Sequence, residues 1–320
     1  MRGATTPRMA EPVPLPGLDL ERFGAWFQAT CPGQVRGPLS ARLLTGGRSN
    51  LTYAVGDGSR DWVVRRPPLG HVLATAHDMP REARVIRALA GTAVPVPRVH
   101  ALCEDPSVLG APFYVMDLVD GVPYRAAADL ARLGPARTRA LAERMVDTLA
   151  DLHALDPDAL GLGDFGRPQG FLARQVRRWK QQLDASRSRD IPGIDALHAA
   201  LAADPPDGAP ATLVHGDYRL DNLLVDADDR IAAVVDWEMA TLADPLTDLG
   251  LLLVYQRIGE LAGEAMASAA PGYPAADELL QRYAARSGRN LGQLGFHVAL
   301  ASFKLAVIAE GIHYRHLQGQ

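Results

Sequence analysis

The sequence has almost no lysine and almost no cysteine. Lys180 and Lys304 are its only lysines, so arginine supplies nearly all of the positive charge. Cys31 and Cys103 are its only cysteines; they form no CxxC pair and have no histidine at metal-ligand spacing. These features exclude a disulfide framework and a zinc site of the usual kind. We interpret both cysteines as reduced thiols that are structural or incidental.

Long apolar runs and strong net charge are also missing. No apolar run approaches the roughly 20 residues of a membrane-spanning helix, and the first residues lack the apolar core of a signal peptide. The net charge of −4 gives no reason to expect nucleic acid or an anionic membrane surface as partner. We therefore expect a soluble cytoplasmic protein with a flexible leader over residues 1–16. The oligomeric state stays open.

The part of the chain that follows the leader divides into two regions of different pattern. Residues 38–118 carry short runs that predict strands, interrupted by one apolar pattern of helical spacing. The predicted strands cover residues 38–47, 49–58, 61–68, 94–102 and 111–119. The predicted helix covers residues 79–91 and ends at a glycine. This pattern indicates a small lobe built on an antiparallel sheet.

Beyond residue 120 the pattern is mostly helical. Helices are predicted over residues 134–155, 170–186, 244–259, 275–288 and 291–319, with short apolar strands near residues 212–214, 223–225 and 231–235. We expect one α+β domain of two lobes, with a lobe boundary close to residues 117–124. The N-terminal lobe covers residues 17–119 and the larger, mostly helical C-terminal lobe covers residues 120–320.

The segment His-Gly-Asp-Tyr-Arg-Leu-Asp-Asn, residues 215–222, lies between two of these short strands. Asp217 and Asn222 stand on one loop and can face a common point. Asp236 ends the next apolar run, where an unpaired buried carboxylate would be costly. Asn222 and Asp236 offer hard oxygen ligands of the kind that Mg²⁺ takes, and Asp217 offers a base. Because Mg²⁺ binds few protein ligands together with phosphates, a nucleotide is the expected third component.

The order of these residues resembles the protein-kinase template, in which a His-x-Asp loop with an Asn five positions later precedes a metal-binding Asp. The His-Gly-Asp form, the Asp-Trp-Glu segment at 236–238 and the following Ala-Asp-Pro-Leu-Thr-Asp-Leu-Gly resemble the aminoglycoside phosphotransferase/choline kinase family. The resemblance covers residue 38 to the end. It implies a bilobal kinase-like fold and an ATP- and Mg²⁺-dependent small-molecule kinase.

The resemblance also implies roles in the N-terminal lobe. The turn that approaches the nucleotide phosphates contains Gly46, Gly47, Ser49 and Asn50. The cation of the third strand, usually lysine, would be Arg65, because it is in phase with Val63; Arg66 is the other candidate for this role. Its partner acid on the following helix would be Glu82.

The segment Pro-Phe-Tyr-Val-Met-Asp-Leu-Val resembles the hinge that binds adenine. There the backbone of Asp117 to Val119 would contact the base, with Met116 behind it. His215 and Asp248 would support the catalytic loop, whereas Asp221 and Asp226 would cap turns. Glu238 would orient metal-bound water or face solvent.

Two alternatives to this function are considered. A protein kinase would need a longer segment after Asp236, but Asp244 follows by only eight positions and a helix then begins. A nucleotide-binding module without catalysis is disfavoured because Asp217, Asn222 and Asp236 all remain in place.

The acceptor is indicated only by charge and by local resemblance. The final helix carries Lys304, His313, Arg315 and His316 with Glu310 as its single acid, which does not suit a polycationic aminoglycoside. Segments such as Arg-Arg-Pro-Pro-Leu-Gly are most similar to kinase-like domains associated with acyl-CoA dehydrogenases. This similarity implies a hydroxy acid or hydroxyacyl-CoA as acceptor, with an aminoglycoside-type antibiotic as the alternative.

Overall fold

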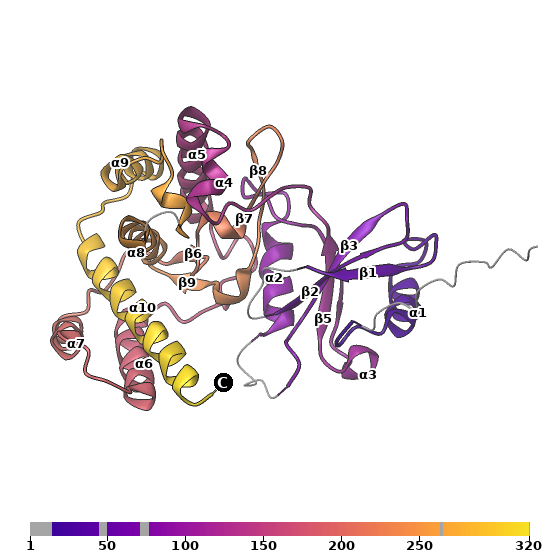
Figure 1. Ribbon diagram of the computed structural model, residues 1–320, viewed down its shortest axis with the longest axis horizontal. Coiled ribbons are helices and arrows are strands. Elements are labelled where there is room, and N and C mark those ends of the chain that lie inside the picture. Colours follow the sequence, from indigo (N-terminus) through magenta and orange to yellow (C-terminus); the bar gives the residue numbers. More distant parts are fainter. Residues whose placement is uncertain (1–14, 45–49, 71–76, 263–264, 320) are drawn as a thin grey trace, which may run out of the picture. The chain divides into compact units, whose positions relative to one another are not determined.

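The computed structural model describes residues 15–44, 50–70, 77–262 and 265–319. The chain forms two compact units, which consist of residues 1–83 with 98–118 and of residues 84–97 with 119–320. Figure 1 shows the strands of the first unit and the many helices of the second. The observed elements are those of an α+β protein with a small sheet unit and a larger helical unit.

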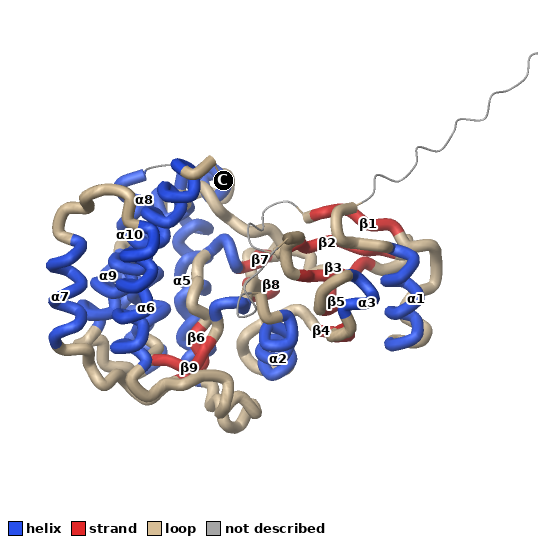
Figure 2. Tube along the Cα trace, turned by 90° about the horizontal axis from the view of Figure 1, so that it is seen from below, coloured by secondary structure: helices blue, strands red, loops and turns tan. Residues whose placement is uncertain are grey.

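The first unit is built on a five-stranded antiparallel sheet, which Figure 2 shows in red beside helix α1. The strand order is β1-β2-β3-β5-β4. The strands are β1 (Ser40–Leu43), β2 (Leu51–Gly56), β3 (Asp61–Arg66), β4 (Val99–Cys103) and β5 (Phe113–Asp117). All five lie inside segments for which the sequence predicts extended structure or overlap them closely.

Helix α1 (Leu20–Thr30) packs on one face of this sheet and was not predicted from the sequence. Asp19 caps it by accepting hydrogen bonds from the backbone N–H groups of the first turn. Its Phe23 and Phe27 join Trp62 and the alternate residues of the central strands in one buried cluster. The short helix α3 (Pro106–Leu109) lies before β5, and helix α2 (Met79–Leu89) follows β3 in sequence.

The second unit contains seven helices among its described residues: α4 (Ala127–Ala131), α5 (Pro135–Ala154), α6 (Phe171–Ser186), α7 (Ile194–Ala203), α8 (Leu246–Ala262), α9 (Ala276–Ser287) and α10 (Leu294–Leu317). Two short antiparallel pairs accompany them, β6 (Thr212–Val214) with β9 (Thr241–Ala243), and β7 (Leu223–Val225) with β8 (Ile231–Val234). The sequence did not predict α7 or β9. Strand β9 has three residues, the same length as the predicted strands β6 and β7.

Helix α10 corrects the expectation that no apolar run approaches the length of a membrane-spanning helix. Among the described residues it is the one helix that is long and apolar enough, by length and composition, to cross a membrane. Its Leu300, Phe303 and Val307 are buried against α6 and α7. Glu310 is also buried and accepts hydrogen bonds from Ser188. These contacts are those of a helix in the core of a folded unit.

Candidate active site

The predicted catalytic loop begins directly after strand β6 and is held by Asp248 of helix α8. The two carboxylate oxygens of Asp248 accept hydrogen bonds from the backbone N–H groups of His215 and Gly216, each at 2.7 Å. Gly216 has a φ of +83°, and a Cβ there would meet the carbonyl oxygen of Met239 at 2.5 Å. Glycine is therefore required at this position of the loop.

His215 supports the same loop with both ring nitrogens. Its Nδ1 accepts from the backbone N–H of Asp217 at 3.3 Å, and its Nε2 donates to the carbonyl of Val235 at 3.0 Å. The ring also lies against Trp237, with a centroid distance of 4.7 Å. With both nitrogens engaged in loop contacts, His215 is placed to support the loop and not to act as a base.

Asp248 is fully buried and has a further partner that the sequence did not reveal. His153 of helix α5 lies with its Nε2 3.2 Å from Asp248 Oδ2, and its Nδ1 is 2.8 Å from the hydroxyl of Tyr283. Burial alone would raise the pKa of Asp248, but the hydrogen bond and charge of His153, with the loop amide of His215, lower it below its usual range. Asp248 is thus held as a carboxylate.

Asp217 is half-buried and receives a donor on each carboxylate oxygen. Asn222 Nδ2 lies 3.1 Å from Asp217 Oδ2 and 2.8 Å from its backbone carbonyl. The hydroxyl of Tyr255, on helix α8, donates to Asp217 Oδ1 at 2.7 Å. The sequence analysis brought Asp217 and Asn222 together, but it did not identify Tyr255.

Asn222 and Asp236 stand at neighbouring strand ends. Leu223 pairs with Val234 in the β7–β8 ladder, and the backbone N–H of Val235 donates to the carbonyl of Asn222 at 2.9 Å. Asp236 follows directly with a φ of 68°, a left-handed conformation that is uncommon for a residue other than glycine. The strand pairing therefore brings these two positions together.

The two side chains fit a hard cation. Asn222 uses its amide nitrogen on Asp217, so its oxygen points elsewhere, and Asp236 supplies carboxylate oxygens. Within the described part of the chain, no three His, Cys, Asp or Glu side chains gather as a metal-binding group. A cation held by Asn222 and Asp236 would therefore take its remaining ligands from phosphates and water, as Mg²⁺ does.

In the first unit, Arg65 pairs with Glu82 as predicted. Arg65 Nε lies 3.1 Å from Glu82 Oε2, and both residues are buried. Strand alternation places Arg65 on the same face as Val63 and opposite to Trp62.

Arg66 corrects the expectation that only one of the two arginines is turned inward. It is also buried, on the other face of the sheet, where its guanidinium donates to the carbonyls of Gly17 and Leu109. Arg66 therefore holds the fold of the first unit, which leaves Arg65 as the candidate for phosphate.

The other predicted nucleotide residues are placed as follows. Gly46, Gly47 and Ser49 lie outside the described residues, and Asn50 lies buried directly before β2. Met116 pairs with Val63 across the sheet and shares the face of Arg65. The backbone N–H of Asp117 already donates to Arg98 at 3.0 Å. Val119 lies two residues after the end of β5, in the segment predicted to contact the base.

Lys304 of helix α10 reaches the catalytic loop. Its Nζ lies 3.3 Å from the carbonyl of Gly216, the residue before Asp217, and 5.8 Å from the ring centroid of Trp179. Burial lowers the pKa of Lys304, while the charges of Asp217 and Asp248 oppose this effect. The sequence identified Lys304 only as one of several basic residues on the last helix. Its contact with the loop arises from tertiary packing.

Three acids with unassigned or capping roles can now be placed. Asp226 accepts hydrogen bonds from the backbone of Asp228 and Arg230 and caps the β7–β8 turn, as predicted. Asp221 binds the guanidinium of Arg219, a contact that the sequence did not predict. Glu238 lies in the short 3₁₀ helix after Asp236, and it is half-buried.

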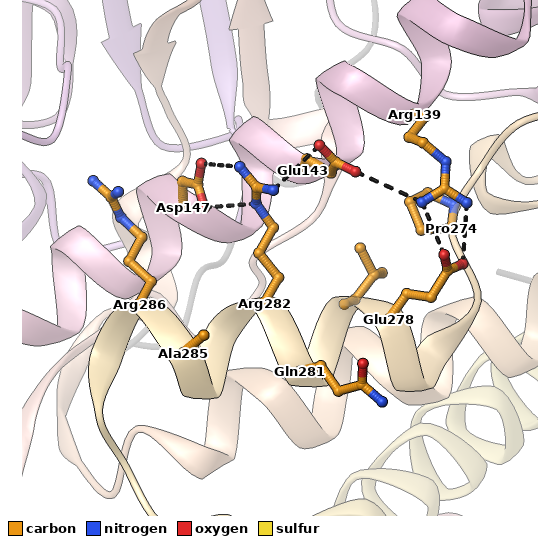
Figure 3. A pocket seen from close by; sticks show the side chains of 10 residues that line it. Arg139, Glu143, Asp147, Pro274, Glu278, Gln281, Arg282, Ala285 and Arg286 are labelled. Atoms are coloured by element: carbon orange, nitrogen blue, oxygen red, sulfur yellow. Dashed lines mark hydrogen bonds and ion pairs between the residues drawn. The ribbon is translucent and has the colours of Figure 1, made fainter.

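A hollow of about 670 Å³ lies along helices α5 and α9, away from the catalytic loop. Figure 3 shows that five of its charged side chains point toward one another: Arg139, Glu143, Asp147, Glu278 and Arg282. Arg282 forms a two-pronged pair with Asp147 at 2.7 and 2.8 Å, and Arg139 binds Glu278 at 2.9 Å. These ion pairs join helix α5 to helix α9. Because the charges are already paired, the loop around Asp217 is the better candidate site.

Comparison with known proteins gives an independent result. Residues 40–279 match the model of the phosphotransferase enzyme family. A crystal structure of a Ralstonia eutropha protein, described as a candidate aminoglycoside phosphotransferase, is 35% identical and superposes with a TM-score of 0.81 over 94% of this chain and 91% of that one. A structure of a thermostable variant of aminoglycoside phosphotransferase APH(4)-Ia with AMP-PNP and hygromycin B is 17% identical, with a TM-score of 0.62 over 91% of this chain and 94% of that one.

The curated relatives that are at least 35% identical to this chain are larger proteins. Acyl-CoA dehydrogenase family member 11 of Gallus gallus is 37% identical over 310 residues, which are 94% of this chain and 40% of that protein. The Homo sapiens protein of the same name is 36% identical over 94% of this chain and 38% of its own length. The chain thus spans about 40% of the length of these relatives. The family matches and the solved neighbours confirm the predicted kinase-like α+β fold.

Proposed function

Because the chain belongs to the phosphotransferase enzyme family and is a small-molecule kinase, we propose that it transfers the γ-phosphoryl group of ATP to a hydroxyl of a small acidic acceptor. The acceptor class is a hydroxy acid or its coenzyme A thioester. The observation that carries the proposal is the carboxylate of Asp217, fixed through both oxygens in a loop that Asp248 anchors.

Asp217 accepts the proton of the acceptor hydroxyl and orients its oxygen toward the γ-phosphorus. The new oxygen–phosphorus bond forms as the bond between the γ-phosphorus and the ADP oxygen breaks. Phosphoryl transfer has a loose transition state, so positioning and charge neutralisation supply most of the rate enhancement. A loop that is anchored through its backbone amides suits this task, because it leaves little freedom to the base.

The nucleotide is held by charged side chains of this chain. Arg65 binds phosphate oxygens, and Glu82 fixes its orientation through the 3.1 Å pair. Asn222 and Asp236 would hold Mg²⁺, which when bound neutralises charge on the phosphate oxygens. Met116, with the backbone of Asp117 and Val119, is the candidate contact for the base.

The acidic acceptor is supported by Lys304 and by the names of the relatives. Lys304 is a partly buried cation that contacts Gly216, the residue before the catalytic Asp217. A polycationic acceptor would be repelled by it. Glu310, the acid that could have offset it, is buried at Ser188. The curated relatives are named for acyl-CoA dehydrogenases, whose substrates are thioesters of acids.

Calorimetric titration with ATP, with and without Mg²⁺, tests the nucleotide site. We expect Mg²⁺-dependent binding in the wild type and weaker binding in Asp236→Ala. Asp228→Ala is the matched control, because Asp228 is an exposed acid on the β7–β8 turn. Equal binding in the wild type and both variants would overturn the assigned metal ligands.

A panel of acceptors then tests the substrate class. Hydroxy acids, their coenzyme A thioesters and kanamycin-type aminoglycosides are compared by ADP release and by the mass of the product. We expect an added phosphoryl group on the acidic compounds. Efficient phosphorylation of aminoglycosides, with none of hydroxy acids or their thioesters, would overturn the acceptor class and leave the kinase class in place.

A further inference from the structure

One helix contacts three consecutive residues of the catalytic loop. Asp248 of α8 binds the backbone of His215 and Gly216, and Tyr255 of α8 binds the side chain of Asp217. Asp248 and Tyr255 stand seven positions apart, which places them on the same face of a helix. The helix that anchors the loop backbone therefore also contacts the proposed base.

Tyr255 is itself held in place by residues of the loop. The guanidinium carbon of Arg219 lies 4.8 Å from the centre of the Tyr255 ring, and Arg219 is bound to Asp221. A cation over an aromatic face is attracted to it and fixes the ring. Burial, followed by the negative charge of Asp217, raises the pKa of Tyr255 above its usual range. The phenol thus keeps its proton and donates a hydrogen bond to Asp217.

The two donors on Asp217 define the direction of its remaining lone pairs. An ionised carboxylate has about four acceptor sites. Asn222 occupies one on Oδ2 and Tyr255 one on Oδ1, so with respect to the described residues one site on each oxygen remains for a hydroxyl. Rotation of the carboxylate about its Cβ–Cγ bond would break both hydrogen bonds.

We propose that Tyr255 is a positioning residue for Asp217: its hydroxyl fixes the carboxylate so that an open lone pair faces the acceptor. This inference rests on the proposed function, in which Asp217 takes the acceptor proton. Tyr255 keeps its own proton throughout, and Arg219 with Asp221 keeps the ring in place. The effect of Tyr255 is therefore on turnover and not on the binding of either substrate.

The kinetic test compares Tyr255→Phe with Tyr273→Phe. Tyr273 is a matched control because it lines the same small cavity as Tyr255, while within the described residues its hydroxyl makes no hydrogen bond to Asp217. Loss of a hydrogen bond to a charged group corresponds to a change of about 10- to 100-fold in a rate or equilibrium constant. We expect kcat to fall by about that factor in Tyr255→Phe, with KM for ATP and for the acceptor within about twofold. Tyr273→Phe should retain the wild-type kcat.

A spectroscopic readout separates this proposal from the proposed function. The protein has eight tyrosines, so ¹³Cζ-tyrosine labelling gives a simple spectrum, and Tyr255→Phe assigns its signal. We expect Asp217→Asn to move that signal and Asp228→Asn to leave it in place. An unmoved signal, or an active wild type with unchanged kcat in Tyr255→Phe, would overturn the positioning role. A wild type without turnover on the whole panel would instead remove the proposed function, and the positioning role with it.

Discussion

Asp248 Oδ2 accepts a hydrogen bond from the backbone N–H of His215 at 2.7 Å, across 33 positions of sequence. Its other oxygen takes the N–H of Gly216 at the same distance. The conformation of the catalytic loop thus depends on a buried acid of another element. A neutral amide has one acceptor oxygen and cannot replace both contacts, since its NH₂ group would face an N–H donor.

Asp248→Asn should therefore destabilise the protein and slow turnover. One of the buried donors is left without an acceptor, which costs about 2–4 kcal/mol. The free energy of unfolding in urea measures this loss. Asp228→Asn changes an exposed acid in the same way, and it should remain within about 0.5 kcal/mol of the wild type. Equal stability of the two variants would contradict the anchoring role of Asp248.

The sequence predicted those parts of the fold whose patterns are long. Helix α5 was expected over residues 134–155 and covers Pro135–Ala154, and helix α6 begins and ends within one residue of its prediction. The predicted family, the kinase-like fold and the enzyme class are confirmed by the comparisons. Short elements carry no periodic signal of their own and were predicted unevenly: the three-residue strands β6 and β7, which flank the catalytic loop, were expected, whereas β9 of the same length was missed.

The candidate site could be predicted only where its residues are close in sequence or follow a known motif. Asp217 and Asn222 lie on one loop, and strand alternation correctly placed Arg65 opposite Arg66. Tyr255 and Lys304 reach the loop from helices that follow it by many residues, so no local pattern reports their contacts. The spacing of Asp248 and Tyr255 on one helix face was the available signal for Tyr255.

Arg65 and Arg66 should separate nucleotide binding from stability. Arg65→Met removes the cation proposed to hold phosphate, and we expect ATP affinity to fall by about tenfold or more. Arg65→Lys keeps a charge that Glu82 can pair with, so it should restore most of the affinity. Calorimetric titration with Mg²⁺ and ATP measures both variants.

Arg66→Met is the control for this prediction. It removes hydrogen bonds to the carbonyls of Gly17 and Leu109, so it should lower Tm and leave ATP affinity unchanged below the transition. A larger loss of ATP affinity in Arg66→Met than in Arg65→Met would show that Arg66, and not Arg65, contacts the phosphates.

Lys304→Met should weaken the binding of the acceptor and leave the binding of the nucleotide unchanged. Loss of the cation beside Gly216 should raise KM for an anionic hydroxy acid by about tenfold, the usual effect of one charge-assisted contact. KM for ATP should stay within about twofold. Lys180→Met is a natural control, because Lys180 is the only other lysine and forms a surface pair with Asp184. Equal effects of the two variants on KM for the hydroxy acid would show that Lys304 does not contact the acceptor.

Glu310 gives a pH dependence of stability whose sign can be worked out. Hydrogen bonds from the backbone and hydroxyl of Ser188, with Arg189 nearby, lower the pKa of Glu310 to about 2. Because the folded-state pKa lies below that of the unfolded chain, about 4.3, the contribution of Glu310 is complete above that value. It is lost as the pH falls toward 2.

Glu310→Gln should therefore cost about 1–3 kcal/mol at pH 7, where a charged acceptor of several hydrogen bonds is replaced by a neutral one. The difference from the wild type should shrink as the pH is lowered from 5 to 3, because the Glu310 carboxyl of the unfolded wild type takes up a proton in this range while that of the folded protein stays ionised. Urea unfolding across this range measures it. Glu260→Gln alters an exposed acid on α8 and should give a small difference at every pH. A difference for Glu310→Gln that is constant with pH would show that the Ser188 contacts do not depend on the charge of the carboxylate.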